Sequence, residues 1–177
     1  MSLMRSLVLL IVFIILALYV FFFESGGKDK ENSLPPVKKA LDIIPEDIGE
    51  IVLRRDDLYV LLENIDSKWR IKRPFEADAN NDMVHDLLSI FDCGIVRVID
   101  EKPSNLKTFG LTSPRYLFAV KDKKGRVRTL LVGDDAPGNL SCYSKLEGSS
   151  QVFLLGVRYR QEFDRALAQF ARPQGKR

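Results

Sequence analysis

The chain has 177 residues, of which 46% are hydrophobic and 29% charged, and it carries a formal net charge of +3, two cysteines and one histidine. This balance excludes a disordered acidic chain, a strongly basic nucleic-acid-binding protein and a disulfide-stapled miniprotein. A multi-span transporter is excluded as well, because only one stretch of the sequence is long and apolar enough to cross a membrane.

That stretch runs from Leu7 to Phe23 and contains no charged residue, glycine or proline. As a helix rising about 1.5 Å per residue it would span about 25 Å, and Met4 and Ser6 extend it towards the ~30 Å thickness of a hydrocarbon core. The core of a secretory signal is usually shorter and is followed by small residues, whereas this run ends in phenylalanines. Residues 1–23 are therefore expected to form an uncleaved, single-pass transmembrane anchor.

The residues that flank the anchor give opposing indications of its orientation. Only Arg5 precedes it, and by the positive-inside rule the larger cluster after it would stay in the cytoplasm. That cluster comprises Lys28, Lys30, Lys38 and Lys39. A short N-terminal tail before a long domain is, however, typical of a signal anchor whose N-terminus stays inside. We expect this second effect to prevail and the C-terminal domain to be exported.

Three further regions follow the anchor. Residues 24–36 are rich in glycine, proline and charge, and are expected to form a flexible tether. Residues 37–170 contain regular apolar patterns and are expected to form one soluble domain. Residues 171–177 lack such a pattern and are expected to be a frayed tail.

The domain begins with three runs of alternating residues, which predict a three-stranded antiparallel meander. The runs are centred on residues 51–54, 58–63 and 68–73. Acidic turns at residues 55–57 and 66–67 separate them.

A helix is expected next. Asp78 or Asn80 would cap its N-terminus, and it should end at Gly94, before a strand over residues 95–99. Its apolar stripe comprises Val84, Leu87, Leu88 and Phe91.

The second half of the domain repeats this plan. Strands are predicted over residues 116–121, 126–132, 141–146 and 151–155. A closing helix carries one apolar stripe, formed by Tyr159, Phe163, Ala166, Leu167 and Phe170. The sequence thus predicts the α+β class: an N-terminal transmembrane helix, then one domain of antiparallel β-meanders with two packed helices and an internal meander–helix duplication.

Three groups of residues resemble the motifs of a known family. They are Trp69-Arg70-Ile71 with Pro74 and Ala77-Asp78; Leu106 to Pro114; and Gly133, Pro137-Gly138, Tyr143 and Val152–Leu155. Their order and spacing over residues 41–170 resemble the domain of unknown function 4340 family.

The resemblance implies a protein of the bacterial envelope that is held by one N-terminal helix. It therefore implies an inner-membrane location with a periplasmic C-terminal domain. Related domains occur at the C-terminal end of auxiliary subunits of gliding-motility-type ABC transporters. The family implies no known catalytic residues, so none is assigned to this chain.

Two parts of these motifs have a direct structural interpretation. The segment Phe109–Pro114 is expected to form a bend, with a positive φ angle at Gly110 and with Phe109 and Leu111 in the core. Trp69 is expected to be a core residue rather than a platform for a ligand.

Three features that could carry chemistry are better explained as structure. The polar segment Gly133–Asn139 lacks the acidic spacing of an EF-hand and the lysine of a phosphate-binding loop, so a plain connecting loop is expected. His85 lies off the apolar stripe of its helix without a second ligand nearby, so a solvated side chain is expected. Cys93 and Cys142 show no metal-binding or redox spacing, and whether they form a disulfide stays open. No cofactor or metal is assigned.

One surface has a functional interpretation with named residues. This basic hairpin contains Lys121, Lys123, Lys124, Arg126 and Arg128. The simpler interpretation is a solvated sheet edge that its cations protect against pairing with another sheet. The alternative is a contact with anionic lipid headgroups or with an acidic partner.

The sequence therefore predicts a non-enzymatic, membrane-anchored envelope domain that binds another protein, such as an ABC-transporter or envelope-assembly component. The alternative is a sensor or carrier domain that binds a small or lipidic ligand between its sheet and its helices. Nucleic acid is not an expected partner, because the net charge of the domain is too close to neutral for phosphate binding.

Overall fold

The computed structural model describes residues 39–90, 94–100 and 102–172. The chain divides into two units, 1–36 and 37–177, and all the described residues belong to the second. The predicted anchor and tether, together with Phe91 and Cys93, lie outside the described part. Within that part, no helix is long and apolar enough to span a membrane.

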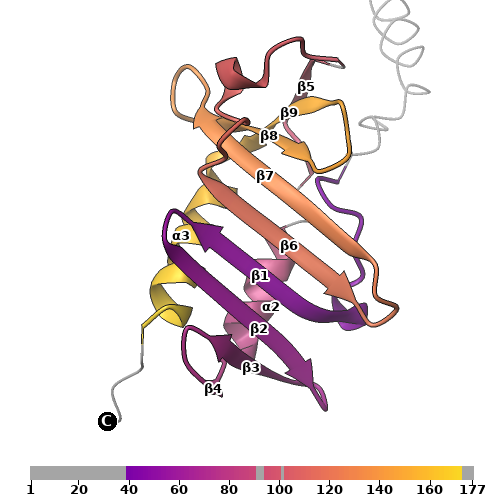
Figure 1. Ribbon diagram of the computed structural model, residues 1–177, viewed down its shortest axis with the longest axis vertical. Coiled ribbons are helices and arrows are strands. Elements are labelled where there is room, and N and C mark those ends of the chain that lie inside the picture. Colours follow the sequence, from indigo (N-terminus) through magenta and orange to yellow (C-terminus); the bar gives the residue numbers. More distant parts are fainter. Residues whose placement is uncertain (1–38, 91–93, 101, 173–177) are drawn as a thin grey trace, which may run out of the picture. The chain divides into compact units, whose positions relative to one another are not determined.

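In the described part of the chain, nine strands form one sheet, and two helices pack against one of its faces (Figure 1). The strands are β1 (Ile48–Arg55), β2 (Leu58–Ile65), β3 (Lys68–Arg73), β4 (Ala77–Asp78), β5 (Arg97–Asp100), β6 (Tyr116–Asp122), β7 (Val127–Asp135), β8 (Ser141–Leu146) and β9 (Val152–Gly156). The helices are α2 (Asn81–Ser89) and α3 (Val157–Phe170), and two short 3-10 helices are η1 (Pro45–Asp47) and η3 (Leu106–Phe109). The predicted α+β class is confirmed.

The strand order is β4-β3-β2-β1-β6-β7-β8-β9-β5, and every pairing is antiparallel. β1 and β6 lie side by side at the centre, and the strands that follow each of them step outward to opposite sides. Each run of strands leads into a helix, α2 in the first half and α3 in the second. Only β5 departs from this plan, because it crosses over to pair with β9.

The first meander forms at the predicted positions. Asp66 and Ser67 both have positive φ angles, which a two-residue hairpin turn with the twist of the strands requires. The sequence pattern missed β4, which has only two residues and pairs Ala77 with Ile71. A strand this short leaves no alternation to detect.

Helix α2 is capped by Asn80, whose side-chain oxygen accepts a hydrogen bond from the backbone N–H of Met83 at 3.2 Å. It ends at Ser89, so the predicted end at Gly94 is wrong. Gly94 does have a positive φ angle of 64°, but it follows the helix only after a short interval. The buried side chains of the helix are Val84, Leu87 and Leu88, as its stripe predicts.

Helix α3 buries its whole predicted stripe against the sheet. The ring of Phe163 stacks on that of Phe118 from the central strand β6, with the centroids 5.5 Å apart. Trp69 joins the same core at 8% exposure, as expected. The core therefore lies between the two helices and one face of the sheet, and no helix of the described residues lies on the opposite face (Figure 1).

Candidate functional site

The face of the sheet opposite the helices carries apolar side chains at positions where a solvated antiparallel sheet usually carries polar ones. Side chains alternate between the two faces of a strand, and the helix-facing apolar residues in the middle of β1, β2, β6 and β7 are buried. Between them lie apolar residues that are only partly buried. These are Val52, Leu61, Leu117, Ala119 and Leu131. We call this surface the open face.

Strand register arranges the open face in three parallel rows. The middle row is Leu61, Val52, Ala119 and Thr129. On one side lies the Arg54 row, which is Tyr59, Arg54, Leu117, Leu131 and Lys145. On the other side lies the Glu50 row, which is Glu63, Glu50, Lys121 and Val127. The face thus has an apolar centre and charged groups on both sides.

Large apolar side chains also lie at the rim of the open face. Tyr59 is 40% exposed, Ile65 41% and Val127 60%. Exposed apolar side chains that surround a partly exposed apolar centre are typical of surfaces that contact other molecules.

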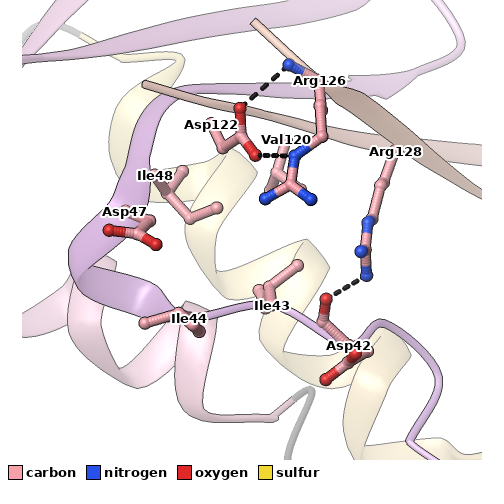
Figure 2. A pocket seen from close by; sticks show the side chains of 9 residues that line it. All are labelled: Asp42, Ile43, Ile44, Asp47, Ile48, Val120, Asp122, Arg126 and Arg128. Carbon is pink, nitrogen blue, oxygen red and sulfur yellow. Dashed lines mark hydrogen bonds and ion pairs between the residues drawn. The ribbon is translucent and has the colours of Figure 1, made fainter. Parts of the chain in front are cut away.

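A groove of about 190 Å³ lies on the helix side of the sheet, at the end of the basic hairpin (Figure 2). Its walls are the segment that leads into β1 and the strands β6 and β7. Its lining residues are Asp42, Ile43, Ile44, Asp47, Ile48, Val120, Asp122, Arg126 and Arg128. The groove therefore has an apolar floor with charged groups around it.

The cations of the hairpin hold the segment that leads into β1. The ammonium of Lys123 donates to the carbonyl of Glu46 at 2.8 Å, and its backbone N–H donates to the carbonyl of Asp47 at 2.8 Å. The guanidinium of Arg128 donates to the carbonyl of Asp42. These hydrogen bonds connect the segment before β1 to the central strands of the sheet.

The other cations of the hairpin differ in their partners. Lys121 lies 3.8 Å from the carboxylate of Glu50, and Arg126 forms an ion pair with Asp122 at 2.6 Å. The ammonium of Lys124 makes no ion pair or hydrogen bond with the described residues. Most of the hairpin's charge is therefore engaged within the domain.

The interpretation of the hairpin as a sheet edge is wrong for β6, which pairs with β1 on its other side. β7 pairs with β8 from Leu130 onward, whereas residues 127–129 of β7, next to the hairpin turn, pair only with β6. The edges are β4 and β5. The sequence pattern could not predict the pairing of β6 with β1, because these two strands lie far apart along the chain.

Asp122 organises the tip of the hairpin. Desolvation would raise the pKa of its carboxyl, but hydrogen bonds from the backbone N–H and the guanidinium of Arg126 and from the backbone of Lys124 outweigh this effect and lower it. The bond uses the Nε of Arg126, and its two terminal nitrogens make no hydrogen bond or ion pair with the described part of the chain. They point towards the groove (Figure 2) and could donate to an anionic group there.

The polar segment Gly133–Asn139 is not the plain loop expected from the sequence. β7 continues to Asp135, whose carboxylate accepts from Arg115 at 3.4 Å and from Arg160 of α3. The strand bulges between Val132 and Asp135, which aims this carboxylate at the helix.

Two motif glycines allow the chain to pass close to this bulge. A Cβ at Gly133 would overlap the carbonyl oxygen of Phe109, and one at Gly110 would lie 2.5 Å from the Asp134 carboxyl carbon. The bend and the positive φ at Gly110 (66°) are as predicted, and Leu111 is buried. Phe109 is only half-buried, because its ring packs on the edge of Tyr143 and not in the core.

A second polar cluster links the sheet to α3. The carboxylate of Asp164 accepts from the Tyr116 hydroxyl at 2.8 Å and from the Arg55 guanidinium at 2.7 Å. Burial, together with this hydrogen bond, raises the pKa of Tyr116 to about 12. All three groups are paired with one another, which is typical of a structural connection between two layers.

The remaining candidates lie apart from these surfaces. His85 is exposed on α2, as predicted. Cys142 is buried, and burial raises the pKa of its thiol. Among the described residues, no three histidine, cysteine or acidic side chains lie close enough together to hold a metal ion.

Sequence reasoning missed the open face, although a signal for it was present. Half-buried strands alternate between apolar and polar residues, whereas β1, β2 and β7 contain unbroken apolar runs. These are Ile51–Leu53, Val60–Leu62 and Leu130–Val132. Such runs indicate strands that are apolar on both faces.

Comparison with known proteins found no match among the curated proteins or among the solved structures. A comparison with family models matched residues 69–174 to a domain of unknown function, DUF4340. The match begins at Trp69 in β3 and includes the bend at Gly110, the bulge after Gly133 and helix α3. Because it covers more than half of the sequence, the chain belongs to the DUF4340 family.

Proposed function

We propose that this protein is a non-catalytic, single-pass membrane-anchored domain of the bacterial envelope that binds another protein. The open face is the observation that supports this proposal. It presents an apolar centre with charged groups on both sides. The centre includes Val52, Leu117 and Leu131. This combination is typical of protein interfaces.

The predicted anchor favours a partner in or near the same membrane. A tether of about a dozen residues would keep the domain within tens of ångströms of the bilayer, which raises its effective concentration for a membrane-bound partner. The occurrence of related domains in auxiliary subunits of ABC transporters favours a transporter or an envelope-assembly component.

The chemistry of the described residues also favours binding over catalysis. The thiol of Cys142 is buried with a raised pKa, so its nucleophilic thiolate form is disfavoured. The carboxylates of Asp135 and Asp164 are both held in ion pairs with arginines of the domain.

Site-specific photocrosslinking in cells tests this function. A benzophenone amino acid in place of Leu117 or Leu131 should give a discrete adduct, because both positions lie at the centre of the open face. The same group in place of the exposed His85, on α2, is the matched control and should give none. Equal labelling from all three positions, or no adduct from the open face, would contradict the proposal.

A second candidate function, the binding of a small anionic or lipidic ligand, is favoured by the groove. The free nitrogens of Arg126 point towards an apolar floor that contains Ile43 and Ile48 (Figure 2). The volume of about 190 Å³ is smaller than the ~300–1,000 Å³ of common ligand pockets, so a headgroup or a small anion would fit better than a whole lipid.

Thermal unfolding of the full chain in a non-ionic detergent tests this second function. Phosphatidylglycerol in the micelles should raise the Tm, phosphatidylcholine should not, and Arg126→Gln should remove the difference. Lys124→Gln is the control for general attraction to anionic lipid, because Lys124 lies on the same hairpin outside the groove lining. The same Tm in both lipids would exclude this function.

We also propose that the two halves of the domain arose by duplication. The outward order of β1 to β4 and of β6 to β9 supports this, as does the helix that follows each run. Superposition of β1–α2 on β6–α3 should align the strands in the same order with the same direction of each helix.

A further inference from the structure

We propose that a second copy of this chain occupies the open face, so that two sheets pack face to face in a symmetric dimer. The inference rests on the proposed function because it uses the same surface, and it names the partner. The distribution of apolar and charged residues over the three rows supports the inference.

A two-fold axis along the middle row would bring that row onto itself. Val52 would then face Val52 of the second copy, and Leu61 would face its own equivalent. The same rotation exchanges the two outer rows, because they lie on opposite sides of the axis. Leu131 would therefore lie over Val127 of the second copy, which is 60% exposed in the single chain.

The charges on the outer rows are complementary under this rotation. Glu50 and Glu63 are directly opposite each other on β1 and β2, an unfavourable pairing of like charges. Lys121 lies 3.8 Å from Glu50, but the carboxylate of Glu63 makes no ion pair within the described part of the chain. Two cations of β3 lie near Glu63, but Arg70 is engaged by Asp78 and Lys72 by Glu76. The acidic pair therefore has room for one more cation.

Arg54 supplies that cation from the other copy. Its side chain is exposed and has no ion pair or hydrogen bond with the described residues. The rotation places it over Glu50 of the second copy, beside Glu63, and the contact occurs twice in the dimer. A hollow of about 230 Å³ lies beside the acidic pair and would receive the guanidinium. Its lining residues are Gly49, Glu50, Glu63, Asn64, Ile65, Lys121 and Asp122.

Charge reversal in the full chain tests the dimer. In a non-ionic detergent, light scattering coupled to size-exclusion chromatography should show a dimer for the natural sequence. Arg54→Glu should weaken self-association at least tenfold, because it places a third carboxylate over the acidic pair. The double variant Arg54→Glu with Glu50→Arg should restore the dimer. Arg158→Glu, at an exposed position on α3 away from the open face, is the matched control and should leave it intact.

A monomer for the natural sequence, or a dimer that survives Arg54→Glu, would overturn the inference. The photocrosslinks from Leu117 show separately whether the dimer and the proposed function are correct. An adduct that contains two differently tagged copies of this chain supports the dimer. An adduct with a different protein overturns the dimer and supports the proposed function alone, and the absence of any adduct overturns both.

Discussion

Gly133 shows why a residue with no side chain can be the most constrained position in a strand. The backbone of Phe109 and Gly110 passes directly over it, and a Cβ there would overlap the Phe109 carbonyl oxygen. A backbone atom cannot move aside as the end of a flexible side chain can. The bend at Phe109–Pro114 and Gly133 belong to two different motifs of the sequence. In the fold they meet in one close contact between the bend and β7.

Gly133→Ala is accordingly expected to destabilise the fold by at least about 2 kcal/mol, because the overlap must displace the bend or the strand. Gly49→Ala is the matched control, since the nearest atoms to its Cβ would be 3.8 Å away, and it should change stability by less than about 1 kcal/mol. Denaturant unfolding of both variants in detergent measures the difference. Equal stabilities would show that the bend can move away from β7.

Tyr116 gives a prediction about pH. Its pKa is raised to about 12 in the folded chain by burial and by the hydrogen bond to Asp164, whereas an unfolded tyrosine ionises near pH 10. The folded state thus holds the proton more tightly. This contribution to stability is complete below about pH 10 and is lost as the pH rises towards about 12.

The free energy of unfolding should therefore fall across this window by about 2–3 kcal/mol more in the natural chain than in Tyr116→Phe, because two pKa units correspond to about this energy. Denaturant titrations between pH 8 and pH 12 measure the difference between the two chains. Parallel curves would mean that the hydroxyl ionises as easily in the folded state as in the unfolded one.

At the scale of elements, helix α2 separates a buried side from a solvated one. Leu87 is 1% exposed in the core, while His85 on the same helix faces solvent. Leu87→Ala should cost roughly 2–5 kcal/mol because it leaves a cavity, and His85→Ala should cost under about 0.5 kcal/mol. Thermal unfolding of the two variants compares them. A large effect of His85→Ala would show that this histidine has a structural or ligand-binding role.

The sequence predicted elements well where a local pattern defines them. The stripes of α2 and α3 and the runs of β1 to β3 and β8 have clear periods, and the structure confirms their positions. The end of α2 and the existence of β4 were not predictable, because neither leaves a periodic signal. Strand β7 was predicted to stop before the acidic residues, but ion pairs from Arg115 and Arg160 let it continue to Asp135.

The sites depended on contacts between distant parts of the chain, and the sequence predicted these less well. The basic hairpin was visible as a run of charge, but its position inside the sheet depends on the pairing of β6 with β1. Its role in holding the segment at Glu46 and Asp47 depends on the same pairing. The two outer rows of the open face likewise become visible only when the register of four strands is known.

At the scale of the whole molecule, the antiparallel sheet with helices on one face explains why a partner is expected. Most such sheets have polar residues on the uncovered face, because water is their second layer. Here the middle row is apolar or buried across four strands, from Leu61 to Thr129. A second protein layer would remove this surface from water.

The side of the membrane on which that layer forms decides which partners are available. We expect the domain to lie outside the cytoplasm, because the predicted anchor follows a short tail with only Arg5 and precedes a long domain. Four lysines between the anchor and β1 favour the opposite orientation, so a measurement of the topology shows which of the two effects dominates in this chain.

Alkaline phosphatase fused after Arg172 should be active, since the enzyme requires export to form its disulfides. A green fluorescent protein fused at the same place should stay dark if the export is by the general secretory route. Inactive phosphatase together with a fluorescent fusion would reverse the orientation and would restrict the partners of the open face to cytoplasmic proteins.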